Sequence, residues 1–189
     1  MEKAYLVQKS SKYYQDLQEY IQRRENQKEF VFKFLREHNV EAKEYWLHGD
    51  GYCDRPFSEE DKKDISLSII PSEKDKEELN KQLCKPDQYK LYGLKKNSKI
   101  GKEFAQYCID NEILINLLEP RIGDYFESDS FMNGLSLGGY RLSQFEVKDK
   151  LYVKLDSHKI NEDTKTPKGF VEIKLSEFYK KLEKFENAR

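Results

Sequence analysis

Cysteines and long apolar runs are scarce in this chain, and each scarcity excludes a class of protein. The 189 residues include three cysteines, Cys53, Cys84 and Cys108, which are odd in number and far apart. That spacing excludes a disulfide framework and the paired ligands of a zinc module, and it favours a reducing compartment. No segment approaches the roughly 20 apolar residues of a membrane span. We therefore expect a cytoplasmic protein with no membrane partner.

Charge of one sign is also lacking, because 34 basic side chains face 35 acidic ones and the formal net charge is −1. This balance excludes the bulk electrostatic attraction of a general nucleic-acid binder. Only 7 of the basic residues are arginine, so bidentate phosphate contacts would be few. What the chain does have is 13% aromatic residues, which supply the large apolar faces of a core.

Local patterns predict a single α+β domain over residues 1–189, with a mixed or antiparallel sheet, a long N-terminal helix and several shorter helices. The long helix is expected to be capped by Ser10 or Ser11 and to end near His38. Shorter helices are expected over residues 72–83, after Ser98 and after Ser176. Strands are expected over residues 3–8, 40–47, 65–69, 89–95 and 112–118, with a hairpin over 140–156 that turns at 148–150. Residues 120–139 carry four of the nine glycines, which is typical of an irregular loop.

The most informative feature is a cluster of cations in this near-neutral chain. Seven lysines and one acidic residue fall between Lys81 and Lys102, a local charge of +6. Ser98 is typical of a helix N-cap, and it places lysines in or beside a first turn, where the macrodipole disfavours cations. A bound anion would offset that cost and accept hydrogen bonds from the helix N–H groups. The predicted binding residues are Tyr92, which could stack on a base, and Lys95, Lys96, Ser98, Lys99 and Lys102.

The simpler interpretation of this window is a solvated face that balances the acidic stretch from Glu59 to Glu78, which holds eight carboxylates against four lysines. That acidic stretch could instead mimic nucleic acid toward a basic partner. The two stretches therefore predict opposite partners, and either function requires them to face outward as separate patches.

Two further constellations have simpler explanations than a metal site. Residues 48–55 fail as a calcium loop, because Arg55 stands where the turn needs glycine. Asp129, Glu146 and Lys148 match a magnesium-nuclease pattern, but Glu-x-Lys occurs four times in this charged chain, so chance suffices.

Arg121 and Arg141 are candidate anion-binding residues, with structural salt bridges as the alternative for each. The sequence contains no Walker loop, dinucleotide fingerprint, nucleophile elbow or zinc motif. We therefore predict no catalytic residue, no metal ligand and no cofactor, and we expect a protein that is not an enzyme.

Three stretches, KQLCKPDQYKLYGLKKNSKIGKEF, EPRIGDYFESDSF and GFVEIKLSEFYKKLE, resemble uncharacterised proteins carried by phages and prophages of low-GC Gram-positive bacteria. The resemblance implies a non-catalytic phage or mobile-element accessory protein that acts in the host cytoplasm. Its partner would be a host protein or nucleoprotein complex, with nucleic-acid contact through Lys81 to Lys102. An anti-CRISPR-type inhibitor of bacterial defence is the sharpest form of this hypothesis. The alternatives are a nucleotide or nucleic-acid phosphate binder and a metal-dependent nuclease.

Overall fold

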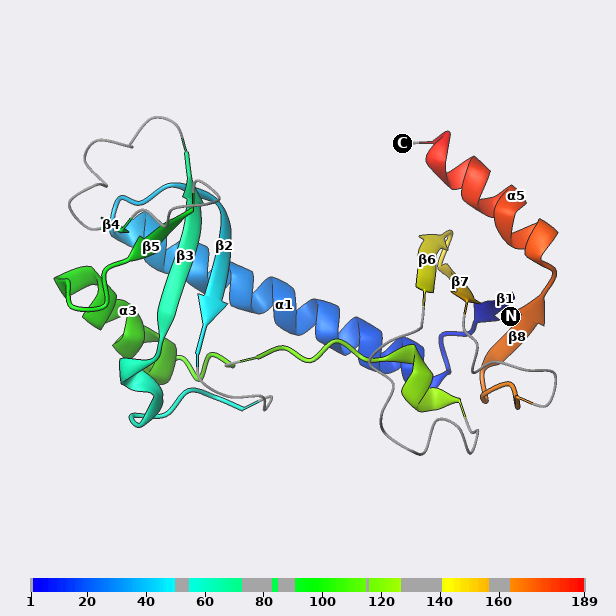
Figure 1. Ribbon diagram of the computed structural model, residues 1–189, viewed down its shortest axis with the longest axis horizontal. Helices are drawn as coiled ribbons and strands as arrows, with labels where there is room; N and C mark the ends of the chain where they lie inside the picture. The colour runs from blue at the N-terminus through cyan, green and yellow to red at the C-terminus, as the bar shows by residue number, and fades with distance from the viewer. Residues whose placement is uncertain are drawn as a thin grey trace. The chain divides into compact units, whose positions relative to one another are not determined.

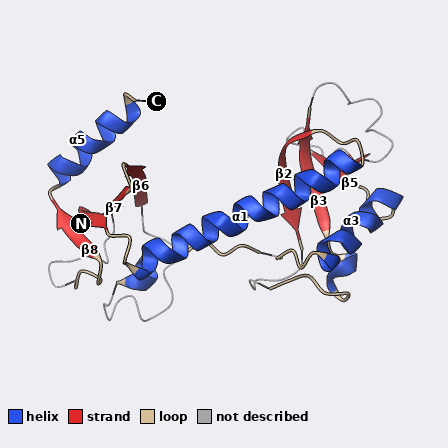
Figure 2. Ribbon diagram, turned by 180° about the vertical axis from the view of Figure 1, so that it is seen from behind, coloured by secondary structure: helices blue, strands red, loops and turns tan. Residues whose placement is uncertain are grey.

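The computed structural model describes residues 2–49, 55–72, 83–84, 91–114, 116–126, 141–156 and 164–188. Helices and antiparallel strands both occur in them, so the predicted α+β class is confirmed (Figure 1). The chain forms two compact units, unit 1 being Met1–Tyr20 with Glu119–Arg189 and unit 2 being Ile21–Leu118. In the described residues each unit holds a four-stranded antiparallel sheet. Figure 2 shows strands in red in both units. None of the described helices is both long enough and apolar enough to cross a bilayer.

Helix α1 (Lys12–Glu37) is the predicted long N-terminal helix. Of the two serines proposed as its cap, Ser11 is the correct one, since its Oγ accepts a hydrogen bond from the Tyr14 N–H at 3.1 Å. The helix ends where Asn39 takes a left-handed conformation with φ 57°. The Val40 N–H then donates to the Leu35 carbonyl at 2.8 Å, which completes a Schellman motif.

In unit 1 the strand order is β6 (Arg141–Val147), β7 (Lys150–Asp156), β1 (Glu2–Val7) and β8 (Phe170–Ile173). The predicted hairpin is confirmed, and it turns at Lys148 and Asp149. Both residues have positive φ, 47° and 63°, as a type I′ turn requires. Strand β8 was not predicted, because four residues with an uneven burial pattern carry little periodicity of their own.

The two faces of the unit 1 sheet are both covered. One face packs Tyr5, Val153 and Leu155 with side chains from the first turns of α1 and from the short helix η3 (Ile122–Tyr125). The other face packs Phe145 and Tyr152 against α5 (Leu175–Glu186), whose Phe178 is fully buried. Helix α5 begins one residue before the predicted cap: Lys174 is its N-cap and Ser176 lies exposed in its first turn, because Leu175 already packs on the sheet.

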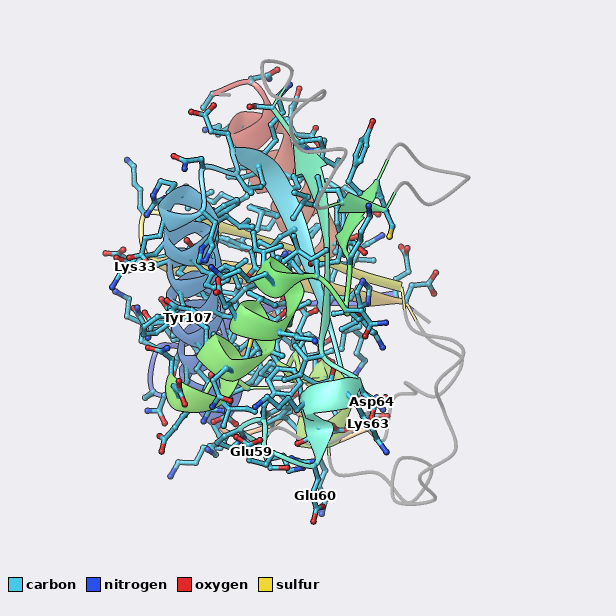
Figure 3. The ribbon with its side chains drawn as sticks, turned by 90° about the vertical axis from the view of Figure 1, so that its left-hand side faces the viewer. Lys33, Glu59, Glu60, Lys63, Asp64 and Tyr107 are labelled. Atoms are coloured by element: carbon cyan, nitrogen blue, oxygen red, sulfur yellow. The ribbon has the colours of Figure 1, made fainter. Side chains whose placement is uncertain are left out.

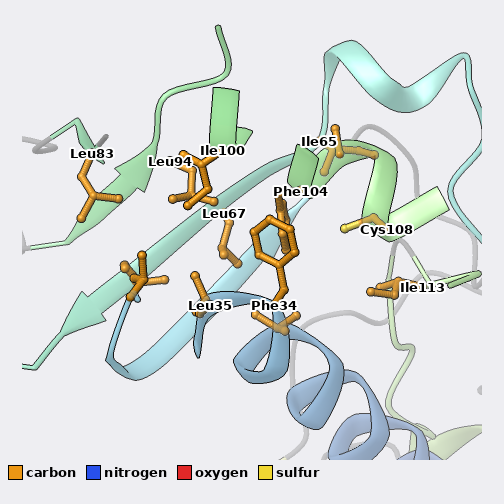
Figure 4. Packing of buried hydrophobic residues seen from close by; sticks show 14 of the residues in the cluster. Phe34, Leu35, Ile65, Leu67, Leu83, Leu94, Ile100, Phe104, Cys108 and Ile113 are labelled. Carbon is orange, nitrogen blue, oxygen red and sulfur yellow. The ribbon is translucent and has the colours of Figure 1, made fainter. Parts of the chain in front are cut away.

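In unit 2 the strand order is β2 (Ala42–His48), β3 (Ser66–Pro71), β5 (Tyr92–Leu94) and β4 (Leu83–Cys84). The predicted alternation in β3 is confirmed, since Leu67 and Ile69 are fully buried while Ser66 and Ser68 are half-buried on the other face. Helix α1 and helix α3 (Lys99–Asp110) close the core over the apolar face. Figure 4 shows Phe34 and Phe104 meeting there, with ring centroids 5.1 Å apart.

Two of the expected elements of unit 2 have other outcomes. The strand over residues 112–118 is wrong in the described part of that range, where an isolated bridge joins Leu114 to Pro56. Glu112 has φ 50° and ends α3 in a left-handed turn, and in the described residues after it the bridge at Leu114 is the strand-type pairing that forms. The helix over residues 72–83 lies mostly outside the described residues, and Leu83 at its end belongs to strand β4.

Phe104 anchors α3 in the core of unit 2, with 1% of its surface exposed. We expect Phe104→Ala to lower the free energy of unfolding by about 3–5 kcal/mol, because it removes a buried ring and leaves a cavity. Phe30→Ala is the matched control, since Phe30 is 39% exposed and should cost less than about 1 kcal/mol. Urea unfolding followed by the fluorescence of Trp46 measures both. Equal losses for the two variants would contradict this account of the core.

Candidate functional site

Most of the described part of the lysine-rich window is strand β5, the segment that links it to α3, and the first turn of α3. Ser98 is the N-cap of α3, as predicted, since its Oγ accepts a hydrogen bond from the Gly101 N–H at 3.1 Å. The Ser98 hydroxyl and N–H both donate to the Lys95 carbonyl, at 2.6 and 2.9 Å. Residues 95–98 therefore form a closed turn on the first turn of the helix. The residues of this window before Leu91, apart from Leu83 and Cys84, lie outside the described residues.

Gly101 allows this turn to lie close to α3. A Cβ at position 101 would stand 2.2 Å from the Lys95 carbonyl oxygen, a distance that no side chain tolerates. The cap and the close turn also reduce the capacity of the helix terminus to bind an anion. Within the described residues, the N–H groups of Lys99 and Ile100 are those of the first turn that keep no acceptor.

A groove of about 760 Å³ lies between α3 and the short helix η1 (Asp61–Lys63). Figure 3 shows Glu59, Glu60, Lys63 and Asp64 on and around η1, beside α3. The floor of the groove is apolar, with Ile65, Gly101 and Ala105. Its rim carries charges of both signs, on Glu59, Glu60, Lys62, Lys63, Lys96, Lys102 and Glu103. The described parts of the acidic and basic stretches thus line one groove, which corrects the expectation of two separate patches.

Polar contacts hold the two sides of the groove together. The Lys62 ammonium contacts the Gln106 side-chain oxygen on α3 and lies 3.3 Å from the Glu59 carboxylate. Gln106 in turn donates to Glu59 at 3.4 Å. The Lys96 ammonium donates to the Lys63 carbonyl at 3.2 Å. Lys62 and Lys96 are therefore partly engaged, whereas Lys102 makes no hydrogen bond or ion pair with the described residues.

Lys99 and Glu103 continue this mixed-charge surface along α3. Glu103 lies 3.7 Å from the Lys99 ammonium and 3.0 Å from His38 Nε2. The His38 ring stacks on Phe34 with centroids 4.1 Å apart, and its Nδ1 lies 2.9 Å from the Phe34 carbonyl oxygen. His38 therefore links the end of α1 to α3 and serves the packing of unit 2.

Three further predicted binding residues, Tyr92, Arg121 and Arg141, are not among the residues that line the groove. Tyr92 is half-buried and packs against the core of unit 2, so its ring does not project outward for stacking. Arg121 is exposed at the start of η3 in unit 1 and makes no ion pair with Asp124. Arg141 opens strand β6 of the same unit opposite Asp156, and its side chain is outside the described residues.

Asp61 has a structural role at the start of η1. Its carboxylate receives two hydrogen bonds from the Arg55 guanidinium, at 2.7 and 2.8 Å. The Ser58 N–H and hydroxyl add two more, at 2.8 and 2.7 Å. These donors hold the pKa of Asp61 well below its usual range, with the Arg55 hydrogen bonds as the largest cause. The carboxylate is charged, buried and fully engaged by the chain.

Of the nuclease pattern, Asp129 lies outside the described residues. Glu146 accepts a hydrogen bond from the Tyr14 hydroxyl at 3.2 Å, and Lys148 stands in the hairpin turn. Among the described side chains, no group of three or more His, Cys, Asp and Glu residues is arranged to hold a metal ion.

The sequence did not reveal a contact between His48 and Ser68 on the face of the unit 2 sheet that lies opposite its core. His48 Nε2 lies 3.2 Å from Ser68 Oγ. The contact is diagonal across β2 and β3, where Trp46 pairs with Ser68 and His48 pairs with Ser66. Only the strand register brings these residues together, so spacing along the chain gave no signal. Because no carboxylate in the described residues orients the imidazole, we interpret the pair as a cross-strand contact.

Comparisons with family models, with curated proteins and with solved structures found no match to this chain. The geometry and charge of the groove therefore carry the functional argument. Its features are an apolar floor, a rim of both signs and a helix terminus that is largely capped from within.

Asp61→Asn tests the structural role of the buried carboxylate. Because the folded-state pKa is depressed, this group stabilises the protein above an unfolded pKa of about 4, and the contribution is lost as the pH falls below that value. We expect the variant to lose about 1.5–3 kcal/mol of unfolding free energy at pH 7 and to show a shallower loss of stability between pH 4 and pH 3. Glu60→Gln is the control, since Glu60 is exposed. Parallel pH profiles for wild type and Asp61→Asn would contradict the assignment.

Proposed function

We propose that this protein is a non-catalytic accessory protein that binds a protein partner through the groove between η1 and α3. The observation that carries the proposal is the combination of an apolar floor with a rim of both charges. A polypeptide segment offers apolar side chains for such a floor and acidic and basic side chains for such a rim. The groove therefore has the complementarity of a protein interface.

The same combination is poorly suited to nucleic acid. A phosphate backbone is bound by a surface on which the charged side chains are positive. Glu59, Glu60 and Glu103 on this rim would repel it. The first turn of α3 is a weak anchor for a phosphate, because Ser98 and the Lys95 carbonyl already occupy part of it. Local geometry thus favours a protein partner over the phosphate-binding alternative.

The resemblance to phage and prophage proteins supplies the biological side of the proposal. It indicates a partner in the bacterial host, and inhibition of a host defence complex is the finer form of the hypothesis. In that form a segment of the host protein would occupy the groove, and this would be a segment through which the host protein assembles its own defence complex. The carboxylates of Glu59 and Glu60 would then meet basic residues of the partner, and Lys102 would meet an acidic one.

The proposal is tested by affinity capture from a lysate of a low-GC Gram-positive bacterium, with and without nuclease treatment. We expect wild type to retain a protein after nuclease treatment, and Lys96→Glu with Lys102→Glu to reduce its recovery roughly tenfold, because like charges across an interface cost one to several kcal/mol. Lys180→Glu with Lys184→Glu on α5 is the control, since it makes the same change of charge on exposed residues of unit 1.

Two results would overturn the proposed function. One is capture that nuclease treatment abolishes, combined with salt-sensitive binding to oligonucleotides, which would assign the phosphate-binding function instead. The other is equal recovery with the groove variant and with the α5 control. Urea unfolding of both variants establishes that each is folded, so that a loss of capture reports on the surface.

A further inference from the structure

A second hollow, of about 330 Å³, lies within unit 1 beside the beginning of α1. Its walls come from three segments that are far apart in the sequence: the first turn of α1, helix η3 and residues 165–170. Three lysines and three aromatic side chains line it, Lys12, Lys165, Lys168, Tyr13, Tyr125 and Phe170. The volume is at the lower end of the range for small-molecule pockets, which is roughly 300–1,000 Å³.

The aromatic side of this pocket is rigid. Tyr13 and Phe170 are buried, and the Tyr13 ring meets the Tyr125 ring edge to face at a centroid distance of 5.2 Å. The Tyr13 hydroxyl donates to Gln144 at 2.9 Å and the Tyr125 hydroxyl donates to Asp16 at 2.6 Å. Both phenols are therefore fixed by hydrogen bonds, and the half-buried Tyr125 ring presents its remaining surface for a flat apolar group.

Among the described residues, the other side of the pocket has an excess of positive charge. Asp16 accepts hydrogen bonds from Lys12 at 2.5 Å and from Tyr125, and these two donors lower its pKa. This carboxylate offsets Lys12 but neither Lys165 nor Lys168, which are exposed and make no ion pair within the described residues. The first turn of α1 contains no acidic residue, so the positive end of a long helix dipole adds to the lysines.

The chain builds this pocket through a special backbone conformation. Gly169 has φ 85°, and its carbonyl accepts a hydrogen bond from the Gln8 N–H at 2.7 Å. A Cβ at position 169 would stand 2.6 Å from the Ser11 Cβ. Only glycine lets the segment with Lys165 and Lys168 lie against the turn that precedes α1. The lysines are therefore held near the aromatic wall by backbone geometry.

We propose that this pocket binds a small phosphorylated compound with a flat ring, in the size class of a nucleoside monophosphate. Lys165 and Lys168 bind the phosphate as point charges, and the Thr166 hydroxyl lies between them in the sequence as a further donor. The ring packs on Tyr125. This site is in unit 1, and it is independent of the groove in unit 2 that carries the proposed function.

Isothermal titration calorimetry with adenosine monophosphate, adenosine and inorganic phosphate tests the proposal. We expect adenosine monophosphate to bind roughly tenfold tighter than either of the other two, because only it contacts both sides of the pocket. Lys165→Glu with Lys168→Glu should weaken that binding roughly tenfold or more. Lys180→Glu with Lys184→Glu should leave it unchanged, and so should Lys96→Glu with Lys102→Glu in the groove.

Several outcomes would overturn the proposal. Inorganic phosphate that binds as tightly as adenosine monophosphate would remove the role of the ring, and adenosine that binds as tightly would remove the role of the lysines. An absence of heat with adenosine monophosphate at millimolar concentration would end the idea altogether. The pocket and the groove belong to different units and are tested with different variants. A protein that does not bind adenosine monophosphate therefore leaves the proposed function of the groove in unit 2 unaffected.

Discussion

The ion pair between Arg55 and Asp61 is the constraint on which the candidate site depends. A carboxylate whose side chain is 8% exposed is expensive to bury, and four hydrogen bonds from Arg55 and Ser58 compensate for its lost hydration. In return, those bonds fix the turn from which η1 begins. Residues 59–63, which end with η1, carry four of the seven charged side chains of the groove rim, and strand β3 begins after two further residues. The position of the rim charges thus depends on a buried acid and an arginine at the surface.

The groove also shows that charge composition along the chain does not predict the charge of the folded surface. Counted along the chain, residues 59–64 are acidic and residues 95–102 are basic. In the fold, η1 and the first turns of α3 lie on one groove, and Lys62, Lys96 and Gln106 bridge its two sides. The result is a surface of mixed sign over an apolar floor. Such a surface selects a partner by pattern more than by net charge.

Local signals explain which parts of this structure could be predicted. Helix α1, strand β3 and the hairpin of β6 and β7 have strong periodicity or a defined turn, and Ser98 has a local cap, so each was found from the sequence. Strand β8 was missed because it becomes a strand only by pairing with β1 from the other end of the chain. The strand expected after α3 was wrong, because it was expected to begin at Glu112, and hydropathy does not reveal that this residue has a left-handed backbone.

The candidate sites were harder to predict than the elements. Charge alone identified Lys96 and Lys102, which line the groove. The side of the sheet on which Tyr92 lies depends on its pairing with Ile69 in β3, so the sequence did not identify it. The groove in unit 2 and the pocket beside the beginning of α1 in unit 1 each join segments that are distant in sequence. The sequence shows which charged and aromatic residues are present, but it does not show which of them the fold brings together.

Helix α1 supplies Tyr13 and Leu17 to the core of unit 1 and Val31, Phe34 and Leu35 to that of unit 2. Between these anchors, residues 21–26 are exposed, so hydrogen bonds along the helix, rather than side-chain burial, keep that stretch ordered. Helix propagation is cooperative. If α1 frays from its end in one unit, the helical stretch that supports the part of α1 packed in the other unit becomes shorter. The two cores, which have no buried side chain in common among the described residues, are in this way linked in stability by one continuous helix.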